Sequence, residues 1–440
     1  MSDASIFHSS FRVQPFWWED AEPSAVGSAE VPPRADVLVI GSGYAGLAAA
    51  IELARNGIAV VVAEAARFGD GGSTRNGGQV AGGIGFADAT RPNDPAMLAR
   101  VRDGIASFKF LEDLIRREGI DCAYQPVGKY FAAWTPAHYE KLKAKAALLN
   151  GSTALRASCV PVEKQRDEIG SDYYYGGLAV EPAALVHPAL LHRGLLDACR
   201  RAGAVLCAET RVTTISGSRG AFRAETSRGP LAAKEIIVAT NGYTGTVTPA
   251  LRRRVVPLAS YIIATEPLEA AIAHELIPRG RAVSDTCRIL TYFRLSPDGR
   301  RMVFGGRARF LPAPPETAAA DLYALMIKRF PQLDGVRISH AWSGMVAFAF
   351  DRLPHMGEID GVHFALCCNG NGIAMMTYLG HQTARKILRR PPQAICAFDS
   401  SSFPTRPLYR GDPAWIMPFI ATAYRTRDAL ERISAAVTRR

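Results

Sequence analysis

The sequence predicts an α/β protein in which a Rossmann-like domain with a parallel sheet is joined to a second domain built on an antiparallel sheet. Three observations predict this fold class. Residues 36–64 have the pattern of one β-α-β unit. Residues 255–310 alternate strands with turns, of which Pro297-Asp298-Gly299 is the clearest, as is typical of antiparallel sheets. Between residues 362 and 389 the chain returns to a strand, a glycine loop and a helix.

The β-α-β unit follows from its apolar pattern. Asp36-Val37-Leu38-Val39-Ile40 is a short apolar strand, and residues 44–56 are rich in alanine and leucine, which favour a helix. Asn56-Gly57 is typical of a helix end. Residues 58–63 form a second apolar strand. Short strands that are apolar on both faces indicate a parallel sheet covered by helices.

The turn between the first strand and the helix carries the fingerprint of a dinucleotide-binding site. It reads Gly41-Ser42-Gly43-Tyr44-Ala45-Gly46. Gly41 permits the tight turn, Gly43 lets the backbone approach a pyrophosphate, and Gly46 lets the helix pack on the strand. The helix N-terminus then directs its positive dipole end at the phosphates. The alternative is a glycine turn without a ligand.

Glu64 and Ala65 stand at the end of the second strand, where the fingerprint expects a ribose-binding carboxylate. Up to this point the residues do not separate NAD from FAD. The glycine-rich residues 67–88 that follow predict a loop. Further on, the pattern predicts helices at about 96–118, 136–149, 184–202 and 316–330, and short strands at 204–208, 211–216, 221–227, 230–233 and 235–239.

The loop after the second strand carries a resemblance to a known family. Gly71-Gly72-Ser73-Thr74-Arg75-Asn76-Gly77-Gly78-Gln79 resembles the G-x-S-x-R-N-G-G-Q loop of gamma-glutamylputrescine oxidoreductases, within the glycine oxidase/D-amino-acid oxidase (DAO) superfamily of flavoproteins. Similar stretches run along nearly the whole chain: His187-Pro188, Phe330-Pro331-Gln332-Leu333, Trp342-Ser343-Gly344, Asp351-Arg352-Leu353-Pro354, Asn369-Gly370-Asn371-Gly372 and Phe403-Pro404. The resemblance implies a DAO/glutathione-reductase-like fold that binds FAD.

The resemblance also implies a role for each part of the FAD site. Ser73, Thr74 and Arg75 would lie near the pyrophosphate and ribityl chain, and residues 76–79 close to the isoalloxazine ring. Backbone at Val212 would contact the adenine, with Ala239, Thr240 and Asn241 on the adenosine side. Backbone N–H groups of Gly370, Asn371, Gly372 and Ile373 would face the flavin O2, where positive dipoles favour reduction.

Four departures from the family pattern narrow the chemistry. No cysteine stands near Gly344, where sarcosine oxidases attach their flavin, so the resemblance implies non-covalent FAD. Val346 stands near the position of the arginine that binds the substrate carboxylate in glycine oxidase, which favours an amine. Val303 stands near the position at which sarcosine oxidases have the lysine that assists the reaction with oxygen. Asn371 replaces a histidine, because the family's S-G-H-G reads N-G-N-G here.

The substrate site is predicted from residue type. His355 is a candidate to face the substrate, against a hydrogen-bonded structural histidine. Tyr261, Tyr292 and Trp342 are candidates for an aromatic wall around an alkylamine, against an ordinary aromatic core. Arg352 or Arg307 could replace the missing carboxylate-binding arginine. We find no nucleophile triad and no metal-ligand spacing in the sequence.

The expected domain organisation is discontinuous. Residues 1–34 form an N-terminal arm that packs on the body through Phe16-Trp17-Trp18. The FAD-binding domain comprises residues 35–100, 155–252 and 345–400, and the substrate-binding domain comprises 101–154 and 253–344. Residues 401–440 pack on the body, although Trp415-Ile416-Met417-Pro418-Phe419 and the basic residues after it could instead touch a membrane surface.

Composition bounds the remaining alternatives. The net charge of +11 favours anionic partners, but without a basic block or recognition module we expect no nucleic-acid binding. No apolar run reaches the roughly 18 to 20 residues that span a bilayer. The N-terminus lacks the pattern of a signal peptide. The eight cysteines are scattered, which fits the cytoplasm.

The sequence therefore predicts an FAD-dependent enzyme that oxidises a C–N bond of a small amine. The resemblance implies hydride transfer to flavin N5, imine hydrolysis, and oxygen as the acceptor with hydrogen peroxide formed. The alternatives are an oxidase of a cyclic or N-alkyl amino acid, of the pipecolate or sarcosine type, and a flavin dehydrogenase that feeds a membrane carrier. The exact substrate and the oligomeric state are left open.

Overall fold

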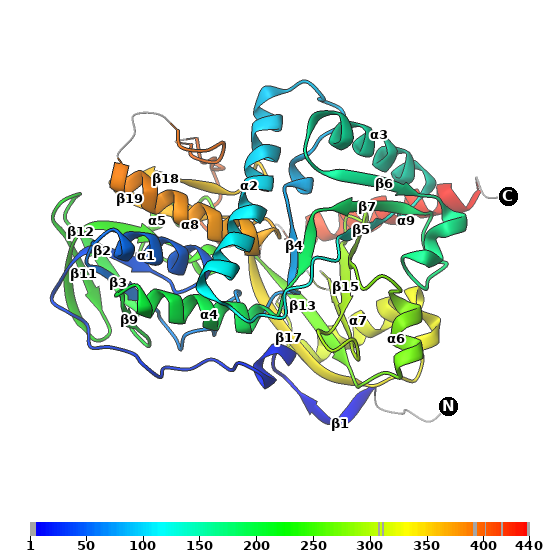
Figure 1. Ribbon diagram of the computed structural model, residues 1–440, viewed down its shortest axis with the longest axis horizontal. Helices are drawn as coiled ribbons and strands as arrows, with labels where there is room; N and C mark the ends of the chain where they lie inside the picture. Colours follow the sequence, from blue (N-terminus) through cyan, green and yellow to red (C-terminus); the bar gives the residue numbers. More distant parts are fainter. Residues whose placement is uncertain are drawn as a thin grey trace.

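The computed structural model describes residues 6–306, 309, 312–389, 394–400, 402–414 and 417–437. Two large sheets organise it, and Figure 1 shows them side by side with helices around each. The first is eight-stranded and the second nine-stranded. A third, small sheet joins β4 (Gln79–Ala81) to β8 (Ala183–Leu185).

The first sheet confirms the predicted parallel unit. Strands β19, β12, β2, β3 and β9 pair in parallel, and β10, β11 and β18 add antiparallel edges. Its strands are β2 (Arg34–Ile40), β3 (Val60–Ala63), β9 (Val205–Cys207), β10 (Val212–Ser216), β11 (Phe222–Thr226), β12 (Gly229–Val238), β18 (His355–Ile359) and β19 (Val362–Leu366).

Helices pack on one another over this sheet. Helices α1 (Tyr44–Arg55), α2 (Pro95–Glu118), α4 (Pro188–Arg201) and α8 (Gly372–Arg389) contribute to one buried apolar cluster together with β2 and β3. A second cluster on the same sheet contains Leu38, Ile236 and Phe364. The sheet is thus buried on both faces, as its nearly continuous apolar strands predict.

The second sheet is mainly antiparallel, as predicted for residues 255–310. Its order is β1-β17-β13-β16-β15-β14-β5-β7-β6, in which only the β1–β17 and β14–β5 pairs are parallel. The strands are β1 (Phe7–Arg12), β5 (Lys129–Ala132), β6 (Arg156–Val160), β7 (Gly177–Glu181), β13 (Val256–Thr265), β14 (Ala282–Asp285), β15 (Thr291–Leu295), β16 (Met302–Gly306) and β17 (Ile338–Phe348).

The helices near this sheet are α3 (Pro136–Ser152), α6 (Ala270–Leu276) and α7 (Pro315–Arg329), with α9 (Met417–Val437) at the end of the described chain. The shorter elements are α5 (Pro249–Arg252), η1 (Phe16–Glu19), η2 (Ile84–Phe86), η3 (Val162–Asp167), η4 (Asn241–Tyr243) and η5 (Pro331–Leu333). Apolar residues of α6 and α7 share one buried cluster with β13 to β17.

Two features differ from the sequence expectation. The arm contains a strand that the sequence analysis did not predict, because β1 pairs with β17. Strands β6 and β7 join the second sheet, although the predicted boundary at residue 155 assigns them to the FAD-binding domain. Both differences involve pairings between distant segments, which no local pattern specifies. The domain limits themselves stay a prediction.

Candidate active site

One cavity of about 510 Å³ draws its lining from both large sheets. This volume lies in the range of small-molecule and cofactor sites. Most of the predicted FAD-binding residues line it: Gly41, Gly43, Tyr44, Ala45, Glu64, Ala65, Ser73, Arg75, Asn76, Gly77, Gln79, Val212, Ala239, Thr240, Asn241, Gly370, Asn371, Gly372 and Ile373. Segments that are far apart in the sequence therefore line one cavity.

Three predicted residues stand behind this lining. Gly46 faces the turn, because a Cβ added there would lie 1.9 Å from the carbonyl oxygen of Gly41. Thr74 is buried and donates its hydroxyl to the carbonyl of Gly69. Gly78 has a φ of +68°. Each of these three residues supports the wall of the cavity, although none of them lines the cavity.

The fingerprint turn presents the start of α1 to the cavity. Gly43 occupies the N-cap position and provides no side-chain cap. Glu64 accepts hydrogen bonds from the backbone N–H of Ser42 at 2.9 Å and from its hydroxyl at 2.8 Å. A carboxylate has about four acceptor sites, so Glu64 is held in place and retains capacity for another donor.

Residues 71–79, which we call the glycine loop, are held by three indole rings. The Nε1–H groups donate from Trp17 to the carbonyl of Asn76, from Trp18 to the hydroxyl of Thr74 and from Trp342 to the carbonyl of Arg75. The distances are 2.9, 3.0 and 3.0 Å. The aromatic arm therefore supports the cavity wall, in agreement with the expectation that it packs on the body.

A second helix N-terminus meets the cavity at Gly372, where α8 begins. The side chain of Asn241 supports the preceding turn, because its Oδ1 accepts from the backbone N–H groups of Cys367 and Cys368. Two helix N-termini thus border one cavity, and such ends favour negative charge. Together with the close backbone approach at the fingerprint, they fit the phosphates and the reduced ring of FAD.

The second sheet supplies another part of the wall. Because side chains alternate along a strand, the register identifies which of them share a face. Ser260 pairs with Gly344, and Tyr292 pairs with both Gly305 and Ser284. Ser260, Ser284 and Tyr292 all line the cavity, and Lys129 of β5 lies in the same wall.

Tyr292 is oriented by its neighbours. Its hydroxyl lies 3.0 Å from that of Ser260. A Cβ added at Gly305 would lie 2.4 Å from a ring carbon of Tyr292, so the ring occupies the space which that glycine leaves open. This tyrosine is the one predicted aromatic substrate residue that lines the cavity in the described part of the chain.

The other predicted substrate residues lie elsewhere. Tyr261 is buried in the core of the second sheet, and its hydroxyl accepts from the backbone N–H of Ala313. Trp342 supports the glycine loop from behind. Both follow the alternative of an ordinary aromatic core, because their polar atoms are engaged by backbone.

The two remaining candidates also lie outside the cavity lining. His355 is buried in β18, stacks on Phe403 and contacts Asp351 at 3.0 Å, which agrees with a structural histidine. Arg352 donates to the hydroxyl of Tyr424. Their predicted roles at the substrate find no support in this placement. Arg307 and the Trp415-Ile416 part of the predicted membrane contact lie outside the described residues.

The sequence reasoning missed Lys129. Part of the Lys129 side chain lines the cavity, and protein atoms surround the rest of it. Burial lowers the pKa of its ammonium group to about 8. In the sequence it is a lysine at the start of a short strand. Lysines are common at such positions, so the residue type did not single it out. The cavity position comes from pairing with β14 and β7, which are distant in sequence.

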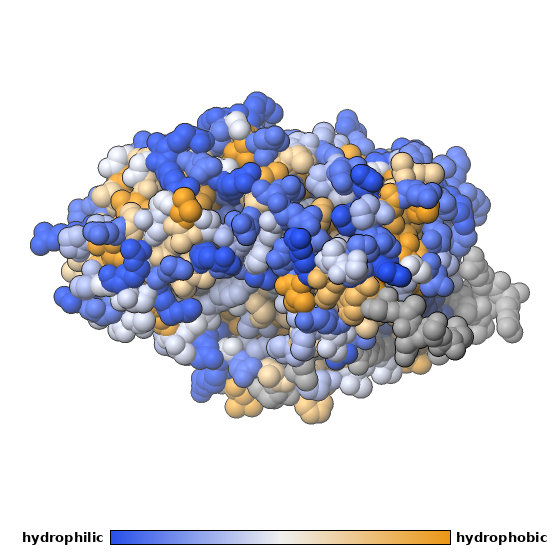
Figure 2. Space-filling model, turned by 90° about the horizontal axis from the view of Figure 1, so that it is seen from below, coloured by the Kyte–Doolittle hydropathy of each residue, from blue (hydrophilic) through white to orange (hydrophobic). Residues whose placement is uncertain are grey.

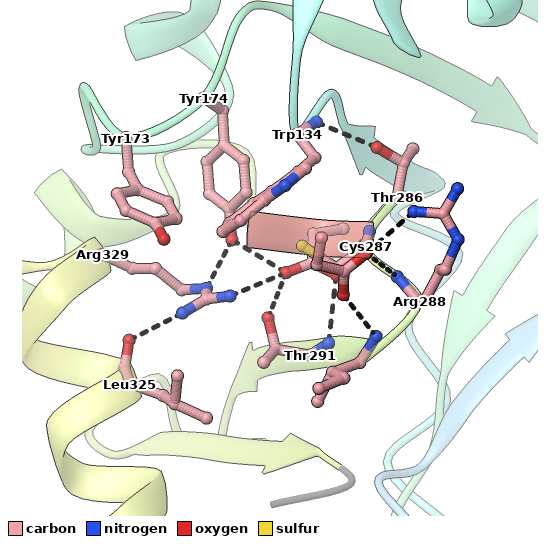
Figure 3. A network of polar contacts seen from close by, with 12 residues as sticks. Trp134, Tyr173, Tyr174, Thr286, Cys287, Arg288, Thr291, Leu325 and Arg329 are labelled. Carbon is pink, nitrogen blue, oxygen red and sulfur yellow. Dashed lines mark hydrogen bonds and ion pairs between the residues drawn. The ribbon is translucent and has the colours of Figure 1, made fainter. Parts of the chain in front are cut away.

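The rim of this wall is the turn 286–290, between β14 and β15. From inside, the buried carboxylate of Asp285 accepts from the backbone N–H groups of Cys287 and Thr291 and pairs with Arg329 at 3.0 Å. Figure 3 shows Arg329, Tyr174 and Thr291 converging on this network. Leu290 of the turn lines the cavity, so the network fixes a part of its wall.

From outside, α9 holds the same turn. Asp428 accepts from the backbone N–H of Ile289 at 3.1 Å and pairs with the Arg288 guanidinium at 3.0 Å. Glu431 also pairs with Arg288. Met417 and Ala421 of α9 pack against Leu258 and Ile289. The described part of the predicted C-terminal segment therefore packs on the body at the cavity rim.

The outer surface bears on the membrane expectation. On the face shown in Figure 2, hydrophilic residues predominate and hydrophobic residues form small separate groups. In α9, Phe419 is 73% exposed and Leu430 is 61% exposed. Within the described ranges, no helix combines the length and apolar character needed to cross a bilayer.

Comparison with known proteins agrees with this site. The family model described as "FAD dependent oxidoreductase" (DAO) matches residues 36–386. The chain is 31% identical over 407 residues to the gamma-glutamylputrescine oxidoreductase of Escherichia coli K12, covering 90% of this chain and 93% of that protein.

Solved structures share the fold. Glycine oxidase from Geobacillus kaustophilus superposes with a TM-score of 0.71 at 20% identity, covering 86% of this chain and 99% of that one. L-Proline dehydrogenase from P. horikoshii also gives a TM-score of 0.71, at 18% identity, covering 85% of this chain and 98% of that one. At this level of identity, the likeness shows the fold alone.

Proposed function

Because the chain belongs to the DAO family of FAD-dependent oxidoreductases, which act on C–N groups of amines or amino acids, we propose that it oxidises a small amine resembling gamma-glutamylputrescine. The observation that carries the proposal is the shared cavity. The fingerprint turn, the glycine loop and the start of α8 line it together with Tyr292 and Ser260. A cofactor and a small substrate can therefore meet in one enclosed space.

The proposed division of labour follows from this lining. The fingerprint turn and Glu64 would hold the FAD pyrophosphate and ribose, and residues 370–373 would face the flavin ring. Bound there, FAD supplies the two-electron acceptor for removal of a hydride from the carbon next to the amine nitrogen. The hydroxyls of Tyr292 and Ser260 would orient the substrate, while Leu258, Met345 and Phe348 keep the space apolar.

We propose that the resulting imine hydrolyses to a carbonyl product and that oxygen is the final acceptor, which would give hydrogen peroxide. We also propose a cytoplasmic location, which the eight free cysteines support. Peroxide release by the enzyme without detergent would favour this reading over a dehydrogenase that feeds a membrane carrier. Turnover only with an added quinone would favour the dehydrogenase.

The test is anaerobic reduction of the FAD-loaded protein by a panel of polyamines, gamma-glutamyl amines and cyclic or N-alkyl amino acids. We expect gamma-glutamyl amines to bleach the flavin absorbance fastest. Tyr292→Phe should slow bleaching about tenfold while FAD stays bound, because one orienting hydroxyl is lost. The matched control is Tyr323→Phe, because the Tyr323 hydroxyl accepts a hydrogen bond from the backbone N–H of Gly335. Failure of every amine to reduce the flavin would contradict the proposed function.

One observation favours the alternative substrates as well. Oxidation of a cyclic or N-alkyl amino acid needs a cation to bind the carboxylate, and Val346 does not supply one. Lys129 places an ammonium group in the same wall. The alternative therefore remains open, and Lys129 can be tested directly.

A further inference from the structure

Lys129 begins β5 and points from the second sheet into the cavity. Its backbone pairs with Ala282 of β14 and Val180 of β7. Ser284, two residues beyond Ala282, lines the cavity on the same face. The lysine therefore belongs to the wall that also contains Tyr292 and Ser260, where this wall meets Gln79 at the end of the glycine loop.

The ammonium group is positioned by Gln79. The Nε2 group of Gln79 donates to the carbonyl oxygens of Val283 and Phe293, both at 3.1 Å. These two bonds fix the amide orientation, so that Oε1 faces Lys129 and accepts from its Nζ at 3.1 Å. The hydroxyl of Ser284 also reaches this oxygen, at 3.4 Å. One N–H of the ammonium group is thus engaged, and Nζ also lies 5.1 Å from the centre of the Phe131 ring. The ammonium group has three donors, so it can still donate to a ligand.

No carboxylate balances this charge in the described part of the chain, where no Asp or Glu oxygen lies within 4.0 Å of Nζ. Three other charged residues of the lining, Arg75, Glu64 and Asp70, have protein partners, and Arg211 is exposed to solvent. Arg75 donates to the carbonyls of Asp70 and Ser343, and Glu64 accepts from Ser42. A buried cation without a counter-charge is costly, and burial accordingly lowers the pKa of Lys129.

We propose that Lys129 binds a carboxylate of the substrate, so that the enzyme selects amines which also carry a carboxylate group. The ligand would supply the counter-charge that the protein omits. This inference rests on the proposed oxidation of an amine at this site. It assigns carboxylate recognition to Lys129 of β5. The residue near the position of the family's carboxylate-binding arginine, Val346, is apolar.

The binding test uses the FAD-loaded protein and two small ligands that need no turnover. Butyrate and its uncharged amide, butyramide, are titrated while the flavin spectrum is recorded. We expect Lys129→Met to weaken butyrate binding at least tenfold and to leave butyramide binding unchanged, since a charged hydrogen bond of about this strength is lost. Lys129→Arg should retain butyrate binding within a few-fold, and exposed Lys109→Met is the matched control.

The substrate test compares amines with and without the carboxylate, such as gamma-glutamylputrescine with N-acetylputrescine and sarcosine with N-methylethylamine. The wild-type kcat/KM should favour the carboxylate-bearing member about tenfold or more, and Lys129→Met should abolish that preference. An unchanged butyrate Kd in Lys129→Met, or equal loss of both ligands, would overturn the proposal. If no amine reduces the flavin, the proposed function fails, whereas the butyrate titration still decides the role of Lys129.

Discussion

The indole N–H of Trp342 donates to the carbonyl oxygen of Arg75 at 3.0 Å, which ties the second sheet to the glycine loop. Trp342→Phe keeps an aromatic ring but removes the donor, and the smaller side chain leaves a cavity at this buried position. The carbonyl is then left without this partner, at a cost of about 1 to 3 kcal/mol. We expect the FAD dissociation constant of the apoprotein to rise about five- to tenfold, as measured by quenching of FAD fluorescence. An unchanged constant would mean that the loop is held without this bond.

Glu64 fixes the fingerprint turn through Ser42. In Glu64→Gln an amide replaces the carboxylate. The oxygen that accepts from the N–H and hydroxyl of Ser42 loses its charge, and an NH2 group replaces the oxygen that accepts from the N–H of Ala66. We expect FAD affinity to fall about 10- to 100-fold, with little change in kcat once FAD is saturating. Exposed Glu163→Gln serves as the control. Equal FAD affinity in the two variants would contradict a role of Glu64 in the cofactor site.

Asp428 holds the cavity rim from α9. In Asp428→Asn, the bonds to the Ile289 N–H and the Arg288 guanidinium are weakened, so the turn 286–290 should become more mobile. We expect KM to rise several-fold and amide hydrogen exchange in this turn to increase, with FAD affinity unchanged. Glu431→Gln, which leaves the Ile289 contact intact, should have the smaller effect. If KM and exchange match the wild type, α9 does not control the rim.

The charge of Lys129 gives a pH dependence to carboxylate binding. Its pKa is lowered to about 8 in the free protein, so the cation is present below this pH and is lost above it. A bound carboxylate would raise that pKa, because it favours the charged form. Butyrate affinity should therefore be constant near pH 6 to 7 and fall about tenfold per pH unit above 8. Lys129→Arg should remove the fall, since arginine stays charged.

The absence of cysteine at Gly344 predicts dissociable FAD. Precipitation of the loaded protein with acid should release the flavin into the supernatant, with the protein pellet colourless. The cavity does contain one thiol, Cys368, whose sulfur lies 3.3 Å from Nδ2 of Asn241. Yellow colour retained in the pellet would contradict the prediction, and Cys368→Ser would then show whether this thiol carries the link.

Local sequence patterns were sufficient to predict the elements whose structure depends on nearby residues. The predicted helix at 44–56 is α1, which ends at Arg55, and the predicted strand at 36–40 lies within β2. The fingerprint spacing and the resemblance of the glycine loop also led to residues that share the cavity. These features depend on neighbours within a few positions, so periodicity and turn chemistry describe them well.

Pairings between distant segments could not be predicted in the same way. Nothing in residues 7–12 indicates a partner at β17, and nothing in Lys129 indicates a cavity. His355 is a substrate-site candidate from its residue type alone, whereas in the structure it lies in β18 and stacks on Phe403. Which face a side chain takes depends on strand register, and register is set by the assembled sheet.

The three indoles have a consequence for synthesis of the chain. Trp17 and Trp18 leave the ribosome early, whereas Trp342 and the β17 strand that pairs with the arm emerge only after most of the chain. The glycine loop therefore cannot be fully clamped while translation is under way. A nascent chain that stalls before β17 would therefore expose an arm that has no strand to join.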